Sequence, residues 1–374
     1  MATFRSVSAA ALFLLPGLAV GAHVSHAATA RRAATTDATW NLAATAHFGQ
    51  AGNASGYSTI LLAGQQLWVF GGTNPGGDST PVAETLAGPR WVQSALPAGL
   101  TDFISDASAP SRHDIWAVSG YGRYVLHWNG RTWRVVRSWR GQGILSGVVA
   151  TSYRSAWVFG TTAGGDRTLG TWRYDAGSWS QVPGLPRDIS VASAVSASDI
   201  WAIDARPRSD AIVRFGGWHW HIVAAGRDIT SIRWDDILAE SDSDVWLIGN
   251  MSGSPADGGR LVLAHWDGLD WTRFVTKLHA WAGRVAPAGP GRVIVTATSS
   301  GILPSGLIGL MTDPGHITWS ALASSLGSGV SDAIYAARTG TIWASGGILT
   351  RLGGDAAVWA RTARAPVGPD SDSD

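Results

Sequence analysis

The sequence predicts an all-β protein, a single β-propeller of about seven four-stranded antiparallel blades. Three observations predict this fold. A short Trp-centred phrase recurs along the chain, mostly at intervals of 41 to 48 residues. A second aromatic phrase with hairpin residues follows most of these phrases, and no stretch shows the 3.6-residue apolar period of a helical solenoid. Four strands per unit at such a period are typical of propeller blades.

The recurring phrase alternates apolar residues with β-branched or aromatic ones and is bounded by Gly, Ser or Asp, which predicts a short strand. Its centres are Trp68, Trp116, Trp157, Trp201, Trp246 and Trp343. The last interval is 97 residues, about twice the others, and the phrase "GRVIVTA" around Ile294 fits a seventh unit that lacks its Trp.

The other strands of each unit are expected on either side of this central strand. Phrases such as Leu126–Val136 and Leu263–Val275 contain Asn-Gly or Asp-Gly pairs that suit tight hairpins, so each predicts two strands. A further strand precedes the central one, as at Ile189–Val195, and a Ser-x-x-Asp turn joins the two. His127 and His265 occupy the same hairpin position in two units, and we interpret them as solvated or hairpin-bonded rather than as metal ligands.

The unit pattern D-[IV]-W-A-[VI]-G followed by H-W-[ND]-G-x-x-W resembles the Trp-rich secreted propeller repeats of actinobacteria. The resemblance covers about Trp40 to Ala363, and it is strongest around Trp116, Trp201 and Trp246. It implies a propeller fold and export from the cell, and it implies no particular activity.

The chain divides into four predicted segments: a signal peptide over residues 1–28, a linker over 29–38, the propeller over 39–363 and a disordered acidic tail over 364–374. The predicted outer strands carry eight Trp residues, one more than the seven central strands. They are Trp40, Trp91, Trp133, Trp179, Trp220, Trp271, Trp319 and Trp359. We therefore expect the N-terminal strand near Trp40 to close the ring against the last blade, which would leave no open sheet edge.

Charge and cysteine content restrict the possible partners. The 28 basic and 27 acidic residues give a net charge of +1, without the basic stripe that nucleic acid requires. The chain has no Cys, so neither a lipid anchor at the signal cleavage site nor a disulfide is possible. We expect a secreted or cell-wall-associated monomer with no transmembrane segment, stabilised by packing alone.

Most of the 21 Trp keep register with the repeat, which indicates packing between blades. Four are out of register: Trp139, Trp218, Trp234 and Trp281. We expect Trp139, Trp234 and Trp281 on the face that carries the long loops, where they either plug the ring mouth or contact a ligand. The candidate ligand-binding residues are completed by four charged neighbours: Arg140, Asp166, Arg206 and Arg208.

The motifs of several propeller enzymes and metalloenzymes are missing. The sequence contains no zinc-protease motif, EF-hand loop, P-loop or nucleophile elbow, so no metal, cofactor or catalytic residue is predicted. The adjacent Asp235 and Asp236 could act as acid and base in glycoside cleavage only with a suitable separation. The leading hypothesis is a non-catalytic extracellular propeller that binds a polysaccharide, peptide or surface protein. The alternative is a secreted carbohydrate-active hydrolase or lyase with its site at the same mouth.

Overall fold

The computed structural model describes ten stretches of the chain, which are residues 40–48, 54–73, 79–140, 143–162, 168–184, 188–205, 210–224, 232–251, 259–289 and 291–362 except 301, 302, 314, 323 and 352. The predicted signal peptide, linker and acidic tail lie outside the described residues. Within them every regular element is a β-strand, and none is a helix that could span a membrane.

Four sheets have four antiparallel strands in chain order. The first contains β2 (Ser55–Ala63), β3 (Gln66–Thr73), β4 (Pro81–Ala87) and β5 (Arg90–Gln93). The second contains β6 (Asp106–Ser111), β7 (Asp114–Ser119), β8 (Tyr124–Trp128) and β9 (Trp133–Ser138). The third contains β10 (Ile144–Ser152), β11 (Ser155–Thr161), β12 (Trp172–Asp175) and β13 (Ser178–Gln181). The fourth contains β14 (Ile189–Ser196), β15 (Asp199–Asp204), β16 (Ala211–Phe215) and β17 (Trp220–Ala224).

A fifth sheet has seven strands because one long strand belongs to two repeat units. The strands are β18 (Ile232–Ser241), β19 (Asp244–Met251), β20 (Arg260–Trp266), β21 (Trp271–Pro287), β22 (Val293–Ser299), β23 (Gly306–Asp313) and β24 (His316–Leu322). The first part of β21 pairs with β20 and its last part, from Ala280, pairs with β22. The expectation of seven separate sheets is thus corrected to six among the described residues.

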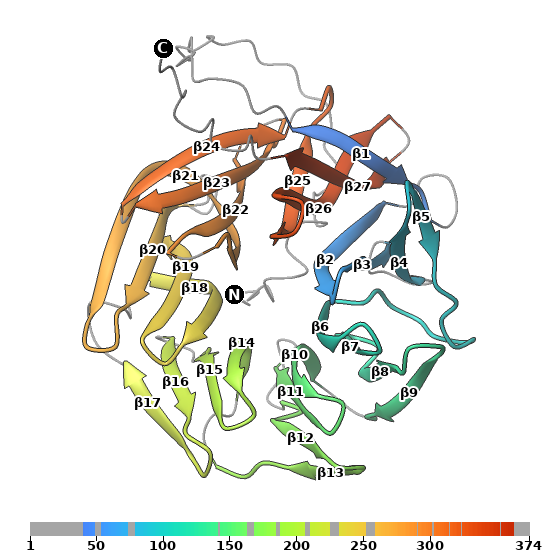
Figure 1. The fold of residues 1–374 in the computed structure, drawn as a ribbon, viewed down its shortest axis with the longest axis vertical. Coiled ribbons are helices and arrows are strands. Elements are labelled where there is room, and N and C mark those ends of the chain that lie inside the picture. Colours follow the sequence, from blue (N-terminus) through green and yellow to red (C-terminus); the bar gives the residue numbers. More distant parts are fainter. Residues whose placement is uncertain are drawn as a thin grey trace, which may run out of the picture.

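The sixth sheet joins the two ends of the described chain. It contains β25 (Ser328–Ala336), β26 (Thr341–Thr350), β27 (Gly353–Thr362) and β1 (Asn41–Ala46). The pairing of β1 with β27 runs from Asn41 opposite Ala360 to Ala46 opposite Ala356. The segment after Trp40 therefore forms the outer edge of the last repeat, the position that the surplus aromatic residue predicted. Figure 1 shows the sheets arranged around a central axis, with β5, β9, β13, β17, β24 and β1 on the perimeter.

The seven predicted central phrases occupy the second strand of each repeat, namely β3, β7, β11, β15, β19, β22 and β26. Their Trp side chains are nearly all buried, and four of them contact the outer-strand Trp of the next repeat edge to face. The ring centroids are 5.9 Å apart for Trp68 and Trp133, 6.2 Å for Trp116 and Trp179, and 6.0 Å for Trp157 and Trp220. The last repeat makes the same contact with the first, since Trp343 lies 6.4 Å from Trp91. Aromatic edge-to-face packing thus joins successive sheets.

The Asp two residues before the central Trp bonds to a His or Arg side chain of the third strand in three repeats. His127 lies 2.7 Å from Asp114 and 4.4 Å, centroid to centroid, from the Trp116 ring. His265 repeats this arrangement with Asp244 and Trp246. In the fourth sheet Arg214 makes two hydrogen bonds to Asp199, of 2.7 and 2.8 Å, and stacks over Trp201. The two His side chains are therefore bonded across the sheet to the Asp of the repeat.

We predict that Trp157→Ala lowers the free energy of unfolding by about 3–5 kcal/mol, because Trp157 is 1% exposed and its removal leaves a cavity between two sheets. Trp218→Ala is the matched control, since this side chain is 92% exposed and its loss should change stability by less than about 0.5 kcal/mol. Equilibrium urea denaturation measures both. Equal stability of the two variants would contradict the packing role.

Candidate functional site

The first strands of the repeats line the central channel, and most carry a β-bulge at a matching position. The register shifts between Tyr57 and Thr59 in β2, between Trp234 and Asp236 in β18, and between Val330 and Asp332 in β25. Strands β10 and β14 have equivalent shifts. A bulge re-aims the side chain that follows it. Three polar side chains, Thr59, Asp236 and Asp332, follow these bulges.

Carboxylates in the channel hold neighbouring inner strands together. Asp106 accepts a hydrogen bond from the backbone N–H of Val148 at 3.0 Å, and Asp236 accepts one from Val285 at 2.8 Å. Asp332 accepts from the Ile60 N–H at 3.1 Å and from the Thr59 hydroxyl at 2.7 Å. Each bond reaches the first strand of the next repeat, so these side chains link successive repeats around the axis.

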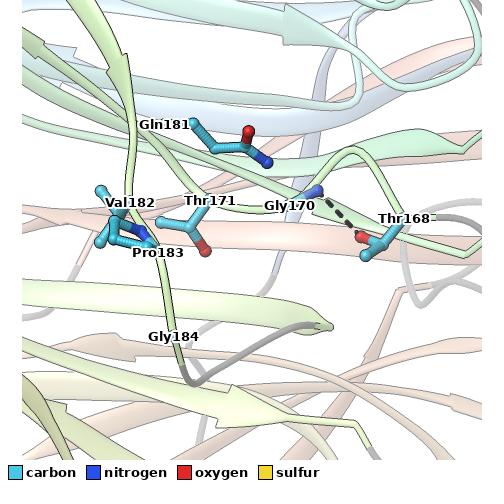
Figure 2. A pocket seen from close by; sticks show the side chains of 7 residues that line it. All are labelled: Thr168, Gly170, Thr171, Gln181, Val182, Pro183 and Gly184. Atoms are coloured by element: carbon cyan, nitrogen blue, oxygen red, sulfur yellow. Dashed lines mark hydrogen bonds between the residues drawn. The ribbon is translucent and has the colours of Figure 1, made fainter.

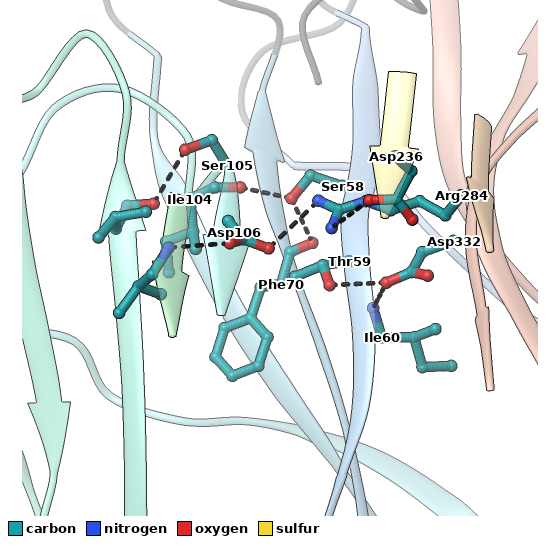
Figure 3. A network of polar contacts seen from close by, with 12 residues as sticks. Ser58, Thr59, Ile60, Phe70, Ile104, Ser105, Asp106, Asp236, Arg284 and Asp332 are labelled. Carbon is teal, nitrogen blue, oxygen red and sulfur yellow. Dashed lines mark hydrogen bonds and ion pairs between the residues drawn. The ribbon is translucent and has the colours of Figure 1, made fainter. Parts of the chain in front are cut away.

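One guanidinium crosses the channel to these carboxylates (Figure 3). Arg284 on β21 lies 3.2 Å from Asp106 and 3.9 Å from Asp236. The four charged side chains of this network, Asp106, Asp236, Arg284 and Asp332, line a cavity of about 270 Å³. Burial raises the pKa of Asp236 to about 7, although Arg284 opposes this effect, and burial also raises the pKa of Asp332.

The channel network is mainly structural, because its carboxylate oxygens are used by backbone N–H groups and by one guanidinium. Among the described residues no group of three His, Asp or Glu could hold a metal ion. Asp235, the other member of the predicted acid and base pair, is buried and forms an ion pair with Arg233 at 2.6 Å. It does not line the channel cavity with Asp236.

A second cavity, of about 370 Å³, lies at the ends of β12 and β13 (Figure 2). Its walls carry small, mostly polar side chains, from Thr168, Gly170, Thr171, Gln181, Val182, Pro183 and Gly184. The Thr168 hydroxyl donates to the Gly160 carbonyl at 2.8 Å and accepts from the Gly170 N–H at 3.0 Å. The cavity borders the β11–β12 connection and the segment after β13, so it lies on the face where the long loops were expected.

A stack of aromatic rings and a guanidinium adjoins this cavity. Trp139, which follows β9, lies 5.5 Å from Trp172 and 6.0 Å from Trp179 in the next sheet. The Arg137 guanidinium is 5.4 Å from the Trp139 ring and 4.8 Å from the Trp172 ring. Trp172 pairs directly with Gln181, which lines the cavity, so one cavity residue lies beside this aromatic group in the β12–β13 ladder.

The short β7–β8 loop completes this surface from the other side. Asp102 holds the loop by accepting from the Ser119 hydroxyl at 2.7 Å and from the N–H groups of Tyr121 and Gly122 at 2.9 Å. The Trp139 N–H donates to the Arg123 carbonyl at 2.9 Å, which makes these two residues cross-strand neighbours. We call Arg123, Arg137, Trp139, Arg140 and Trp172 the Arg–Trp cluster.

The predicted site residues that the structure describes lie in different sheets and do not form one site. Trp139 is half-buried and Arg140 is exposed, and both belong to the Arg–Trp cluster. Trp281 is 40% exposed but pairs with Thr298 in another sheet. Trp234 is only 3% exposed and packs in the core between the fourth and fifth sheets, so of its two expected roles it lacks the exposed surface that contact with a ligand requires. Asp166, Arg206 and Arg208 lie outside the described residues.

Sequence reasoning missed Arg137, Trp172 and the channel network apart from Asp236, which was singled out only as a neighbour of Asp235. Strand alternation places Arg137 on the same face of its strand as Trp139 two residues later, a signal that was available. Trp172 was interpreted as facing a hairpin. The signal for Arg284 was weaker: it is a lone charged residue in the apolar stretch "WAGRVAP", and no pattern identifies its partners Asp106 and Asp236.

We predict that Asp236→Asn removes a pH dependence of stability. A carboxyl group whose pKa is raised by folding stabilises the folded state below its ordinary value near 4, and this stabilisation is lost as pH rises toward 7. Wild type should therefore lose stability relative to the variant between pH 4 and 7 in denaturation experiments. Asp270→Asn, at an exposed hairpin, is the control. A constant difference between wild type and Asp236→Asn across this range would contradict the assignment.

Comparison with known proteins supports the architecture alone. No known protein family matches the chain, and no curated protein matches its sequence. Solved structures match over most of it. The structure of YCF48 bound to D1 peptide has a TM-score of 0.57 at 16% identity, covering 87% of this chain and 97% of the other. A streptogramin B lyase has a TM-score of 0.58 at 12% identity, covering 86% and 97%.

A third similar structure is the GH74 xyloglucanase from Xanthomonas campestris, with a TM-score of 0.54 at 14% identity. The match covers 83% of this chain and 53% of the xyloglucanase, so the chain corresponds to about half of that enzyme. All three identities are low, and likeness at this level shows only the fold. The chain has a propeller-like all-β fold of antiparallel, mostly four-stranded sheets.

Proposed function

We propose that the chain is a secreted, non-catalytic binding propeller that presents its loop-rich face to a polysaccharide, peptide or surface protein. The observation that carries this proposal is the Arg137–Trp139–Trp172 stack beside the 370 Å³ cavity. Concave surfaces with aromatic faces and a few hydrogen-bonding groups are typical of ligand sites. Such surfaces are usually built by loops on a rigid scaffold, which the ring supplies.

We further propose that the ring is closed and has seven blades. The seven-stranded sheet would count as two blades that share β21, because its first part pairs outward with β20 and its last part pairs with β22. Seven second strands carry the repeat phrase, in agreement with this count. The β1–β27 pairing and the contact between Trp343 and Trp91 support closure. Such a ring provides one continuous loop-rich face.

Binding rather than turnover is favoured because Asp102, the carboxyl group beside the Arg–Trp cluster among the described residues, is occupied by three hydrogen bonds within the β7–β8 loop. The similar solved structures include a peptide complex and a xyloglucanase, so propeller-like scaffolds of this kind serve both peptide recognition and polysaccharide chemistry. The predicted signal peptide over residues 1–28 and the absence of Cys suit a protein that works outside the cell.

We predict that Trp139→Ala weakens ligand binding about tenfold or more, because loss of a central aromatic contact usually has an effect of this size. Binding to a glycan and peptide array would be followed by intrinsic Trp fluorescence. Trp218→Ala is the control, since Trp218 lies on a hairpin at the opposite end of the strands. Unchanged affinity of Trp139→Ala for a ligand that wild type binds would place the site elsewhere.

A hydrolase or lyase is the second candidate, and one observation favours it. Asp236 lines the 270 Å³ channel cavity, and its raised pKa of about 7 suits a general acid. If this candidate is correct, Asp236→Asn abolishes turnover of a polysaccharide while Trp139→Ala only raises KM. Reducing-end release from the glycans that bind would measure both effects. Binding without any product from wild type would support the non-catalytic proposal.

A further inference from the structure

We infer that the loop-rich face recognises an acidic polysaccharide, whose sugar carboxylates bind the guanidinium groups of the Arg–Trp cluster. This inference rests on the proposed binding function and specifies its ligand. The cluster combines flat indole rings, positive charge and an adjoining polar cavity. Each of these features matches one part of a uronic-acid residue: the C–H face of the ring, the carboxylate and the hydroxyl groups.

The positive charge of the cluster is not neutralised by a carboxylate among the residues that the structure describes. Arg123, Arg137 and Arg140 form no ion pair with any carboxylate in the part of the chain that the structure describes. The neighbouring carboxylate, Asp102, uses one oxygen for three hydrogen bonds that hold the β7–β8 loop. Two other partly buried Arg side chains, Arg214 and Arg284, do have carboxylate partners.

Two donors of the cluster also lack acceptors. The Nε atoms of Arg123 and Arg137 are both buried and make no hydrogen bond. Core indole N–H groups such as those of Trp68, Trp157 and Trp201 lack a partner as well, so the inference depends on the unpaired charge and the aromatic contacts of Arg137 rather than on these two atoms. A carboxylate is the acceptor that a guanidinium binds most strongly, often through two parallel hydrogen bonds.

A sugar fits the surroundings better than a peptide does. The cavity offers the Thr168 and Thr171 hydroxyls and the Gln181 amide, groups that can pair with ligand hydroxyls. Its larger apolar side chains are only Val182 and Pro183, so it lacks the deep apolar pocket in which a peptide anchors a side chain. The Arg137 guanidinium contacts both the Trp139 and the Trp172 ring, which restricts where this group can lie.

The test compares polygalacturonate, polyglucuronate and alginate, each in its acid and its methyl-esterified form, by calorimetry with the full mature protein. We expect the acid form of at least one polymer to bind about tenfold or more tightly than its ester. The affinity should fall as salt rises, because the interaction is ionic. Arg137→Gln should remove this preference, and Arg140→Gln, at an exposed position with no packing role, should reduce it without loss of fold. Arg154→Gln, on the exposed turn between β10 and β11, is the control and should keep full preference.

The outcomes separate this inference from the proposed function. Equal binding of acid and ester forms overturns the acidic-ligand inference and leaves a saccharide-binding propeller. Binding of poly-glutamate, with no binding of the acidic polysaccharides, overturns the choice of a saccharide in favour of an acidic peptide. Absence of binding to every acid, ester and peptide, in a protein shown to be folded by circular dichroism, contradicts both the inference and the proposed binding function.

Discussion

The edge-to-face contact between the central Trp of one repeat and the outer-strand Trp of the next is the interaction on which the packing of neighbouring sheets depends. The sheets have no disulfide and no helix to cover them among the described residues, so each must bury its faces against its two neighbours. At four of the interfaces a large aromatic ring makes the same edge-to-face contact. The others differ, since Trp201 contacts Trp266 at a tilt and Trp246 stacks on His265. The same contact between Trp343 and Trp91 joins the last repeat to the first.

The periodic Trp residues made the fold predictable because burial between sheets restricts both their position and their type. The second strands, the hairpins at Asn129-Gly130 and Asp267-Gly268, and the outer strand after Trp40 followed from this pattern. The continuity of β21 was not predictable. The repeat spacing predicted that one unit ends and the next begins within this strand. The stretch Lys277–Ala280, where the two units meet, contains no Gly, Pro or other turn residue, so the chain continues as one strand. Only the pairing with both β20 and β22 shows that the strand runs on.

The candidate site was predictable only in part, because its members are distant in sequence. Trp139 and Arg140 were identified because they break the repeat, whereas Trp172 keeps register and was assigned to packing. Trp234 also breaks the repeat, but it fills the interface with the fourth sheet instead of facing solvent. A Trp that departs from the repeat therefore marks a local difference in structure. Packing against the neighbouring sheet decides whether that Trp side chain is exposed or buried.

The channel network and the Arg–Trp cluster differ in whether their charged groups have partners of opposite charge. In the channel, Asp106, Asp236 and Asp332 are satisfied by backbone N–H groups of the next inner strand and by Arg284. In the Arg–Trp cluster, the guanidinium groups have aromatic neighbours and no carboxylate. The first environment stabilises the ring, and the second is left with unmet hydrogen-bonding capacity at a surface, which is the property of a binding site.

Hydrogen–deuterium exchange with and without a bound ligand tests the central claim, that the binding surface lies between the second and third sheets on the loop-rich face. If the surface lies there, the backbone amides of residues 119–123, 137–140 and 168–172 should exchange more slowly when the ligand is added. Exchange at the hairpin around Trp218 should not change. Protection confined to the channel strands or to the hairpin face, with these three segments unchanged, would contradict it.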